Sequence, residues 1–70
     1  MSPEKLAYMA NQIGKFFAHQ GSDKAVASIA DHLRKFWSPS MRDAAIGHLE
    51  GGTPGFDPLV RRAVESLRSL

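Results

Sequence analysis

The sequence predicts an all-α fold, a small bundle of about four short helices in which the first two form an antiparallel hairpin. Three observations support this fold class. Apolar residues recur at the i, i+3, i+4 and i+7 spacing that places them on one face of a helix. Three segments begin with a capping residue followed by proline, namely Ser2-Pro3, Ser38-Pro39 and Asp57-Pro58. Glycine interrupts the helical pattern at Gly21 and again in the stretch 51–55.

These signals predict helices at about residues 3–20, 23–37, 39–50 and 58–69. A Ser or Asp side chain before a helix accepts hydrogen bonds from free backbone N–H groups, and proline suits the first helical position because it lacks an N–H. Gly21 is placed to end the first helix. The stretch 51–55 is the one long loop.

The periodicity also predicts which faces are buried. On the first two helices these faces consist of Leu6, Met9, Ala10, Ile13, Phe16, Phe17 and Gln20, and of Val26, Ile29, Ala30, Leu33, Phe36 and Trp37. The later helices contribute Met41, Ala44, Ala45, His48 and Leu49, and then Leu59, Val60, Ala63, Val64 and Leu67, preceded by Phe56. We expect Ile13, Phe17, Leu33 and Trp37 to supply the core between the first two helices.

A second stripe on the first helix consists of Ala7, Asn11, Gly14 and Ala18. Glycine inside a helix costs about 1 kcal/mol relative to alanine. Gly14 therefore indicates that another backbone approaches the helix closely, from this chain or from a partner.

Composition and motifs argue against an enzyme and against a metal protein. The 70 residues predict a single domain, 1–70, and the absence of cysteine excludes disulfides and thiolate metal sites. His19, His32 and His48 lie on three different predicted helices without acid–histidine spacing. The serines that precede helices are explained as caps, and the glycine-rich stretch has no lysine and follows no strand. No catalytic, cofactor-binding or metal-ligating residue is predicted.

Charge and hydropathy predict a cytoplasmic protein that does not enter a membrane. Nine basic and seven acidic residues give a net charge of +2, and they are scattered along the chain, which is weak support for nucleic-acid binding. No apolar run approaches the ~20 residues of a membrane span. The first residues lack the basic stretch and apolar core of an export signal.

Tyr8 falls opposite the predicted apolar face of the first helix, close to Lys15. An exposed tyrosine is either an ordinary surface residue or a contact with a partner protein, because tyrosine is enriched at interface hot spots. Both interpretations stay open, and the second makes Tyr8 and Lys15 candidate partner-binding residues.

Cations and aromatic rings lie together in the segment 32–37. One interpretation buries its apolar residues and leaves its cations on a solvated flank. The other joins Arg34 and Lys35 to Arg42 as a basic patch that binds an acidic protein surface. Nucleic acid could use the same patch, but no stripe of Lys and Arg extends it and no glycine turn marks a recognition helix.

Four segments, taken together, resemble those of a known protein family, although no single motif among them would be sufficient evidence. They are Ser2-Pro3-Glu4-Lys5-Leu6, Tyr8 to Ile13, Ala30 to Trp37 with Pro39 and Met41-Arg42, and Gly55 to Val60. In order and spacing they resemble the delta subunit of soluble, NAD-dependent, molybdenum-containing formate dehydrogenase. Around Pro39 the family usually has Asp and Arg, where this chain has Ser38 and Ser40. Ser38 can cap a helix as Asp does, whereas Ser40 lacks the positive charge.

The resemblance implies an accessory subunit. In this family the alpha subunit holds the molybdenum cofactor and iron–sulfur clusters and oxidises formate, and the beta and gamma subunits pass electrons to NAD. The delta subunit has no redox centre and supports the stability of the complex or the maturation of the molybdenum cofactor. The implied partner is the alpha subunit and, through it, beta and gamma. Two alternatives remain open: a free assembly chaperone for the apo alpha subunit, and a small nucleic-acid-binding regulator.

Overall fold

The computed structural model describes residues 2–52 and 55–68, which fold into four α-helices. Helix α1 (Pro3–Phe17) runs into a 3-10 turn, η1 (Ala18–Gln20), and is followed by α2 (Ser22–Phe36), α3 (Pro39–Glu50) and α4 (Pro58–Arg68). The predicted all-α class is confirmed, and each helix begins within one residue of its predicted start. Two residues of the predicted loop, 53–54, lie outside the described ranges.

The expected helix starts have a local physical basis. The backbone N–H of Lys5 donates to Ser2 Oγ, and that of Met41 donates to Ser38 Oγ, each at 3.2 Å. Both serines therefore cap helices as predicted, with proline next in the chain. Gly21 separates η1 from α2 with a φ of +92°, a conformation that residues with a Cβ rarely adopt.

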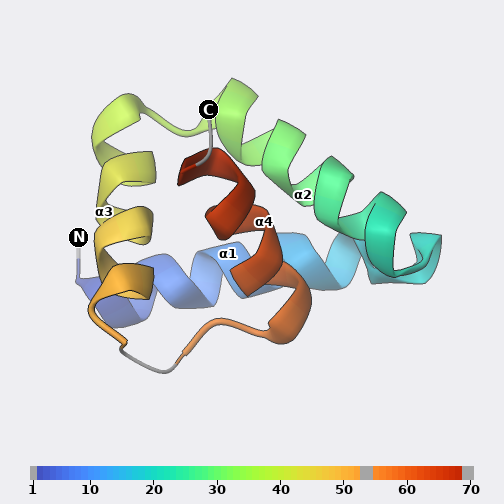
Figure 1. Ribbon diagram of the computed structural model, residues 1–70, viewed down its shortest axis with the longest axis horizontal. Coiled ribbons are helices and arrows are strands. Elements are labelled where there is room, and N and C mark those ends of the chain that lie inside the picture. Colours follow the sequence, from blue (N-terminus) through green and yellow to red (C-terminus); the bar gives the residue numbers. More distant parts are fainter. Residues whose placement is uncertain (1, 53–54, 69–70) are drawn as a thin grey trace.

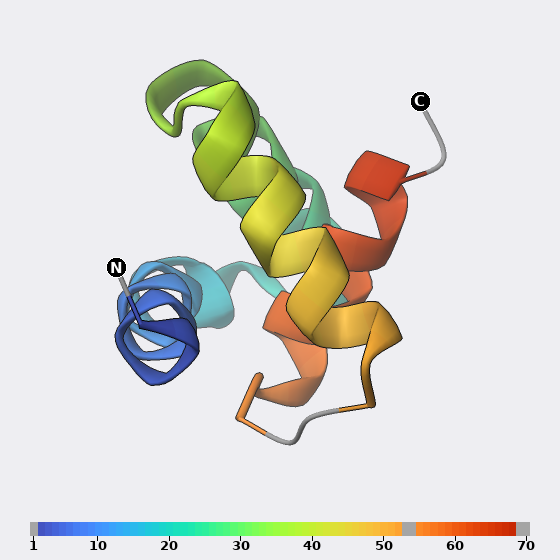
Figure 2. The same ribbon diagram turned by 90° about the vertical axis from the view of Figure 1, so that its left-hand side faces the viewer.

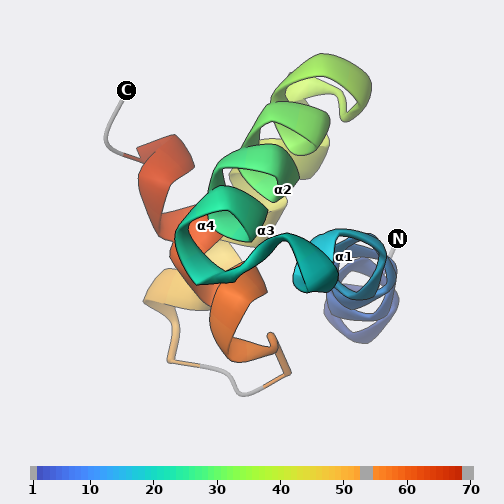
Figure 3. The same ribbon diagram turned by 90° about the vertical axis from the view of Figure 1, so that its right-hand side faces the viewer.

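Helix α4 lies among the other helices and contacts all three of them, most extensively α2 (Figure 1). Helices α1 and α2 diverge from the turn at Gly21, as the view from the other end also shows (Figure 3). In a view along α1, the other three helices lie on one side of it (Figure 2). The antiparallel hairpin predicted for the first two helices is not confirmed, since α2 packs chiefly on α4.

The core is built from all four helices and contains many small side chains. Its buried apolar residues are Leu6, Ala7, Ala10, Ala25, Ile29, Ala30, Leu33, Trp37, Ala45, Val60, Ala63, Val64 and Leu67. The predicted core positions of Leu33 and Trp37 are confirmed. Ile13 and Phe17 are half-buried and pack against this core rather than forming its centre.

Three large residues predicted to be buried are exposed instead. Phe16 is 73% exposed, Phe36 72% and Met9 37%, and the small Ala44 of α3 is exposed as well. For α1 the physical reason is Gly14, because a Cβ built there would lie 2.5 Å from Val60 Cγ2 of α4. Gly14 of the small-residue stripe thus faces α4, and the large side chains of Met9 and Phe16 turn away from it, whereas Ala18 at the end of the stripe is exposed.

The end of α2 places two adjacent rings on different sides. Trp37 has an extended backbone (φ −88°, ψ 141°), although its N–H still donates to Leu33 O at 3.0 Å. Leaving the helix at this point lets the indole of Trp37 reach the core, where the residue is 7% exposed. Phe36 keeps its helical position and stays in solvent.

The side chain of Asn11 on α1 holds the segment that leads into α4 close to α1. Its Nδ2 donates to Gly55 O at 2.6 Å, and the N–H of Asp57 donates to Asn11 Oδ1 at 2.9 Å. One side chain therefore pairs with two backbone groups that no helix satisfies.

Candidate functional site

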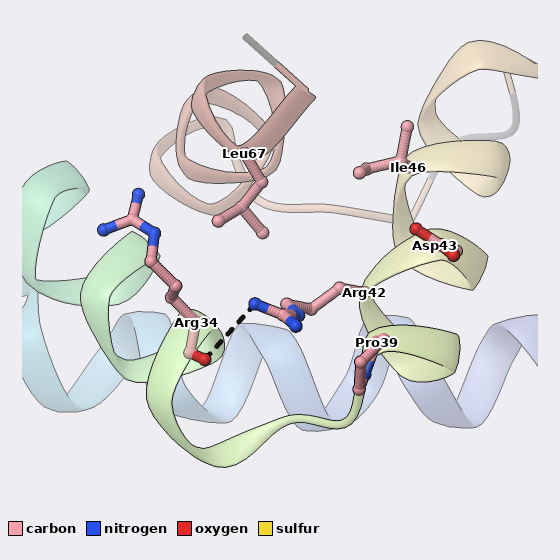
Figure 4. A pocket seen from close by; sticks show the side chains of 6 residues that line it. All are labelled: Arg34, Pro39, Arg42, Asp43, Ile46 and Leu67. Carbon is pink, nitrogen blue, oxygen red and sulfur yellow. Dashed lines mark hydrogen bonds between the residues drawn. The ribbon is translucent and has the colours of Figure 1, made fainter. Parts of the chain in front are cut away.

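Two of the predicted partner-binding cations meet where α2 turns into α3. Arg42 is half-buried, and its Nη1 donates to Arg34 O at 3.3 Å (Figure 4). Together with Pro39, Asp43, Ile46 and Leu67 they line a hollow of about 210 Å³ between α2, α3 and α4. Because Arg42 also holds a backbone carbonyl and Asp43 lies in the same hollow, this corner is a weaker cation patch than the sequence suggests.

Lys35 is not part of that hollow. Its Nζ lies 3.1 Å from Asp31 Oδ2, one helical turn earlier, and both side chains are mostly exposed. Such an i, i+4 pair is worth a few tenths of a kcal/mol, but it offsets the charge of Lys35 locally. The structure thus brings Arg34 and Arg42 together and leaves Lys35 on a different side of α2.

Tyr8 and Lys15 lie seven residues apart on α1 and therefore share one face of it. Both are exposed, Tyr8 to 64%. Lys15 also lines a second hollow, of about 190 Å³, with Gly14 of α1, Ala18 of η1 and residues 57–60 at the start of α4. The residues that line this hollow and those that line the hollow at Arg34 and Arg42 do not overlap.

The sequence pattern did not predict a row of four rings across α1 and α2, which consists of Phe16, Phe17, His32 and Phe36. The ring centroids are separated by 5.1 Å from Phe16 to Phe17, 6.1 Å from Phe17 to His32 and 4.7 Å from His32 to Phe36. The two middle rings are half-buried, and the two outer rings are nearly three-quarters exposed. We call these four residues the aromatic row.

The Phe16 end of the aromatic row lies on the side of α1 opposite the contact between Gly14 and α4. Successive helical residues are rotated by about 100°, so Phe16 points almost opposite to Gly14, which packs on Val60. The same rotation on α2 separates Phe36 from Arg34. The sequence contained one signal for this, the small stripe at Gly14, which marks the buried face more reliably than the large residues do.

The histidines of the described residues lie apart from one another in the fold, on η1, α2 and α3. Within residues 2–52 and 55–68, no group of three or more His, Asp or Glu side chains is placed to hold a metal ion. His32 belongs to the aromatic row, and His48 packs edge-on against Phe56 with ring centroids 5.2 Å apart. His48 Nε2 is buried without a hydrogen-bond partner among the described residues.

Comparison with known protein families identifies one match. The family model of the NADH-dependent formate dehydrogenase delta subunit, FdsD, matches residues 5–64. The chain belongs to this family. The matched range covers α1 from Lys5 onward, all of α2 and α3, and the first part of α4. It includes the aromatic row and every predicted partner-binding residue. No curated protein and no solved structure gives a significant match.

Family membership confirms the resemblance found in the sequence and makes a formate dehydrogenase complex the context in which the chain acts. The delta subunit is consistent with an accessory role in an oxidoreductase complex. In the described part of the chain, no helix has the length and apolar character needed to cross a membrane.

Proposed function

We propose that this chain is a non-catalytic accessory subunit that binds the alpha, or catalytic, subunit of a cytoplasmic NAD-dependent molybdenum formate dehydrogenase. Bound there, it supports the stability of the complex or the maturation of the molybdenum cofactor, and it reaches beta and gamma through alpha. The family match supports the complex as context.

The main support for binding to another subunit is that Phe16 and Phe36 are exposed in a chain that belongs to a family of formate dehydrogenase subunits. Single apolar residues on a surface are ordinary, but joined apolar side chains exposed together are typical of interaction sites. The aromatic row joins its two exposed rings through Phe17 and His32. Covering such a surface removes apolar area from water, and this is a main driving force of protein association.

The predicted residues enter this proposal with different roles. Tyr8 is exposed and contributes affinity, because a desolvated tyrosine can be worth 2 kcal/mol or more. Lys15 on the same face, and Arg34, Lys35 and Arg42, contribute orientation and salt sensitivity, because a rim charge is worth about 0–1 kcal/mol. We do not propose nucleic-acid binding, since Lys35, Arg62 and Arg68 each pair with a carboxylate within the described residues.

The test is co-expression of the alpha subunit with and without this chain, followed by purification through a tag on alpha. We expect the chain to co-elute with alpha, and its omission to lower the yield of assembled complex or the molybdenum content of alpha. Elution of alpha alone, with unchanged molybdenum and activity, would contradict the proposal. The Tyr8→Ala variant and an Arg34→Ala/Lys35→Ala variant, each checked for folding, then test affinity and salt dependence separately.

The same experiment separates a permanent subunit from an assembly chaperone. A subunit remains in the mature, active complex in a fixed ratio to alpha. A chaperone is found with molybdenum-free alpha and is absent from the active enzyme.

A further inference from the structure

We infer that the hollow at Arg34 and Arg42 receives one carboxylate side chain, that of an Asp or a Glu of the partner subunit. This inference rests on the proposed function and gives the two arginines a defined ligand in addition to an orienting role. Its first support is the lack of a counter-charge. Three ion pairs form among the described residues, and neither arginine takes part in any of them. Two guanidinium groups that line one hollow without a paired acid favour an anion there.

The second support is that most hydrogen-bond donors of these two side chains are unused. Arg42 is half-buried, yet its one hydrogen bond, from Nη1 to Arg34 O, is 3.3 Å long. Bonds of this type are usually about 2.7–3.2 Å long, so this one is weak. A guanidinium carries several N–H donors, and that of Arg34 donates to no acceptor among the described residues. A carboxylate that accepts from both arginines forms charge-assisted hydrogen bonds, which are stronger than bonds between neutral groups.

The third support is the size and lining of the hollow. Pockets for small molecules and cofactors typically measure about 300–1,000 Å³, whereas this hollow measures about 210 Å³. Its apolar part consists of Pro39 and Ile46 of α3 and Leu67 of α4 (Figure 4). That lining suits the methylene groups of a single side chain whose carboxylate lies at the arginines. A partner that covers the hollow also excludes water, and this strengthens the attraction between opposite charges.

One lining residue, Asp43, opposes an anion and limits how acidic the bound segment is. Asp43 is exposed and forms no ion pair among the described residues. Two arginines and one aspartate leave the lining with a net charge of +1. One carboxylate neutralises that charge, whereas a strongly acidic surface would bring further carboxylates close to Asp43. The charges of the lining therefore favour a single Asp or Glu in an otherwise neutral contact.

The experiment measures binding of the purified full-length chain to the alpha subunit by biolayer interferometry, at low and moderate salt. We expect an Arg34→Gln/Arg42→Gln variant to weaken the Kd about tenfold or more, because the partner's carboxylate is then covered without a counter-charge. An Arg34→Lys/Arg42→Lys variant keeps the charges but not the planar guanidinium groups, so it should recover only part of that loss.

A single variant guards against loss of the fold. Arg34→Gln alone removes no hydrogen bond of the described residues, because Arg42 donates to the backbone oxygen of Arg34. It should weaken the Kd about threefold or more and leave the melting temperature unchanged. Circular dichroism and thermal melting check that every variant is folded.

Two further variants test the sign of the charge in the hollow. Asp43→Asn removes the one acid of the lining and should tighten binding about two- to fivefold at low salt, and less as the salt concentration rises. Lys24→Gln/Arg61→Gln removes two cations that do not line the hollow, as a control for the loss of positive charge. This control should bind within about twofold of the parent at moderate salt.

A free carboxylate tests whether the hollow is covered by the partner. Sodium acetate should weaken the binding of alpha more than sodium chloride does at the same ionic strength, and only in the parent chain, not in the Arg34→Gln/Arg42→Gln variant. If nuclear magnetic resonance shows acetate bound at Arg34 and Arg42 of the isolated chain while alpha binds unhindered, the hollow is a site for a free anion, and the inference is wrong.

The outcomes separate the inference from the proposed function. If the parent chain does not bind alpha, the proposed function fails. If the parent binds and the Arg34→Gln/Arg42→Gln variant binds equally well, the hollow is not a docking site, whereas the proposed function stands. If Asp43→Asn weakens binding, the group that enters the hollow is cationic, and the inference is wrong.

Discussion

The two sides of α1 depart from the usual relation between side-chain size and burial. The buried side carries three small residues, Ala7, Ala10 and Gly14, beside the single large residue Leu6, whereas the opposite side carries Met9 and Phe16, which are exposed. Large apolar residues are more often inside, so size alone would bury the second side. Which side of α1 is buried depends instead on how closely α4 approaches it, because two helices can pack closely only where their side chains are small. Close packing therefore leaves the large side chains available for another contact.

The largest difference in stability is expected between substitutions of two adjacent rings at the end of α2, Trp37 and Phe36. We expect Trp37→Ala to lower the free energy of unfolding by about 3–5 kcal/mol, because it removes a large ring from the core. We expect Phe36→Ala to change it by less than about 1 kcal/mol, because that ring is mostly in solvent. Urea denaturation followed by circular dichroism measures both values. Equal losses in the two variants would show that Phe36 is part of the core and not available to a partner.

A second pair of variants tests the close approach at Gly14. Alanine raises helix stability by about 1 kcal/mol relative to glycine, but a Cβ at residue 14 would lie 2.5 Å from Val60 Cγ2. Overpacking of this kind costs about 1–3 kcal/mol, so Gly14→Ala should destabilise the protein by up to about 2 kcal/mol. A Cβ at Gly47 of α3 would have no such neighbour within 4 Å, so Gly47→Ala should stabilise the protein by about 0.5–1 kcal/mol. Stabilisation by both substitutions would mean that α4 does not approach α1 at Gly14.

Much of the fold follows from local signals in the sequence. The caps at Ser2 and Ser38 and the glycine at position 21 act within one helical turn, so they are visible without knowledge of the tertiary structure. The relative placement of helices depends on contacts far apart in the chain. The divergence of α1 from α2 follows from the position of α4, which no local pattern encodes.

The candidate site was harder to predict for the same reason. On α1 the apolar residues cover a wide arc, and periodicity cannot tell which part of the arc faces inward. Phe16 and Phe17 fit the pattern equally well, yet only Phe17 packs against the core. The rotation of α1 is set by Gly14 against Val60, a contact between residues that are far apart in sequence. Tyr8 lies opposite the arc under either rotation, so its exposure was predictable.

A smaller effect is expected at Asn11, which fixes the buried side of α1 to the segment before α4. Asn11→Ala removes two hydrogen bonds, to Gly55 O and from the N–H of Asp57. Both bonds are solvent-exposed, so we expect a loss of about 1 kcal/mol in thermal unfolding experiments. Hydrogen exchange at the Asp57 amide should become faster in this variant. The Gln12→Ala substitution, at an exposed neighbouring position, is the control and should leave both measurements nearly unchanged.

The smallest effect is expected at Phe16, and it decides whether the exposed side of α1 is free for a partner. Serine and phenylalanine have similar helix propensities, so Phe16→Ser tests burial with little change in the helix itself. Because Phe16 is 73% exposed, we expect the free energy of unfolding to change by less than about 0.5 kcal/mol. Phe17→Ser, one residue later, should cost about 1–3 kcal/mol, since Phe17 packs against the core and against His32. Urea denaturation of both variants measures the difference.

If Phe16→Ser costs as much as Phe17→Ser, then α1 is rotated with Phe16 inward, and the aromatic row cannot be a binding surface. A small cost at Phe16 together with a large cost at Phe17 places the boundary between core and interface between these two adjacent residues.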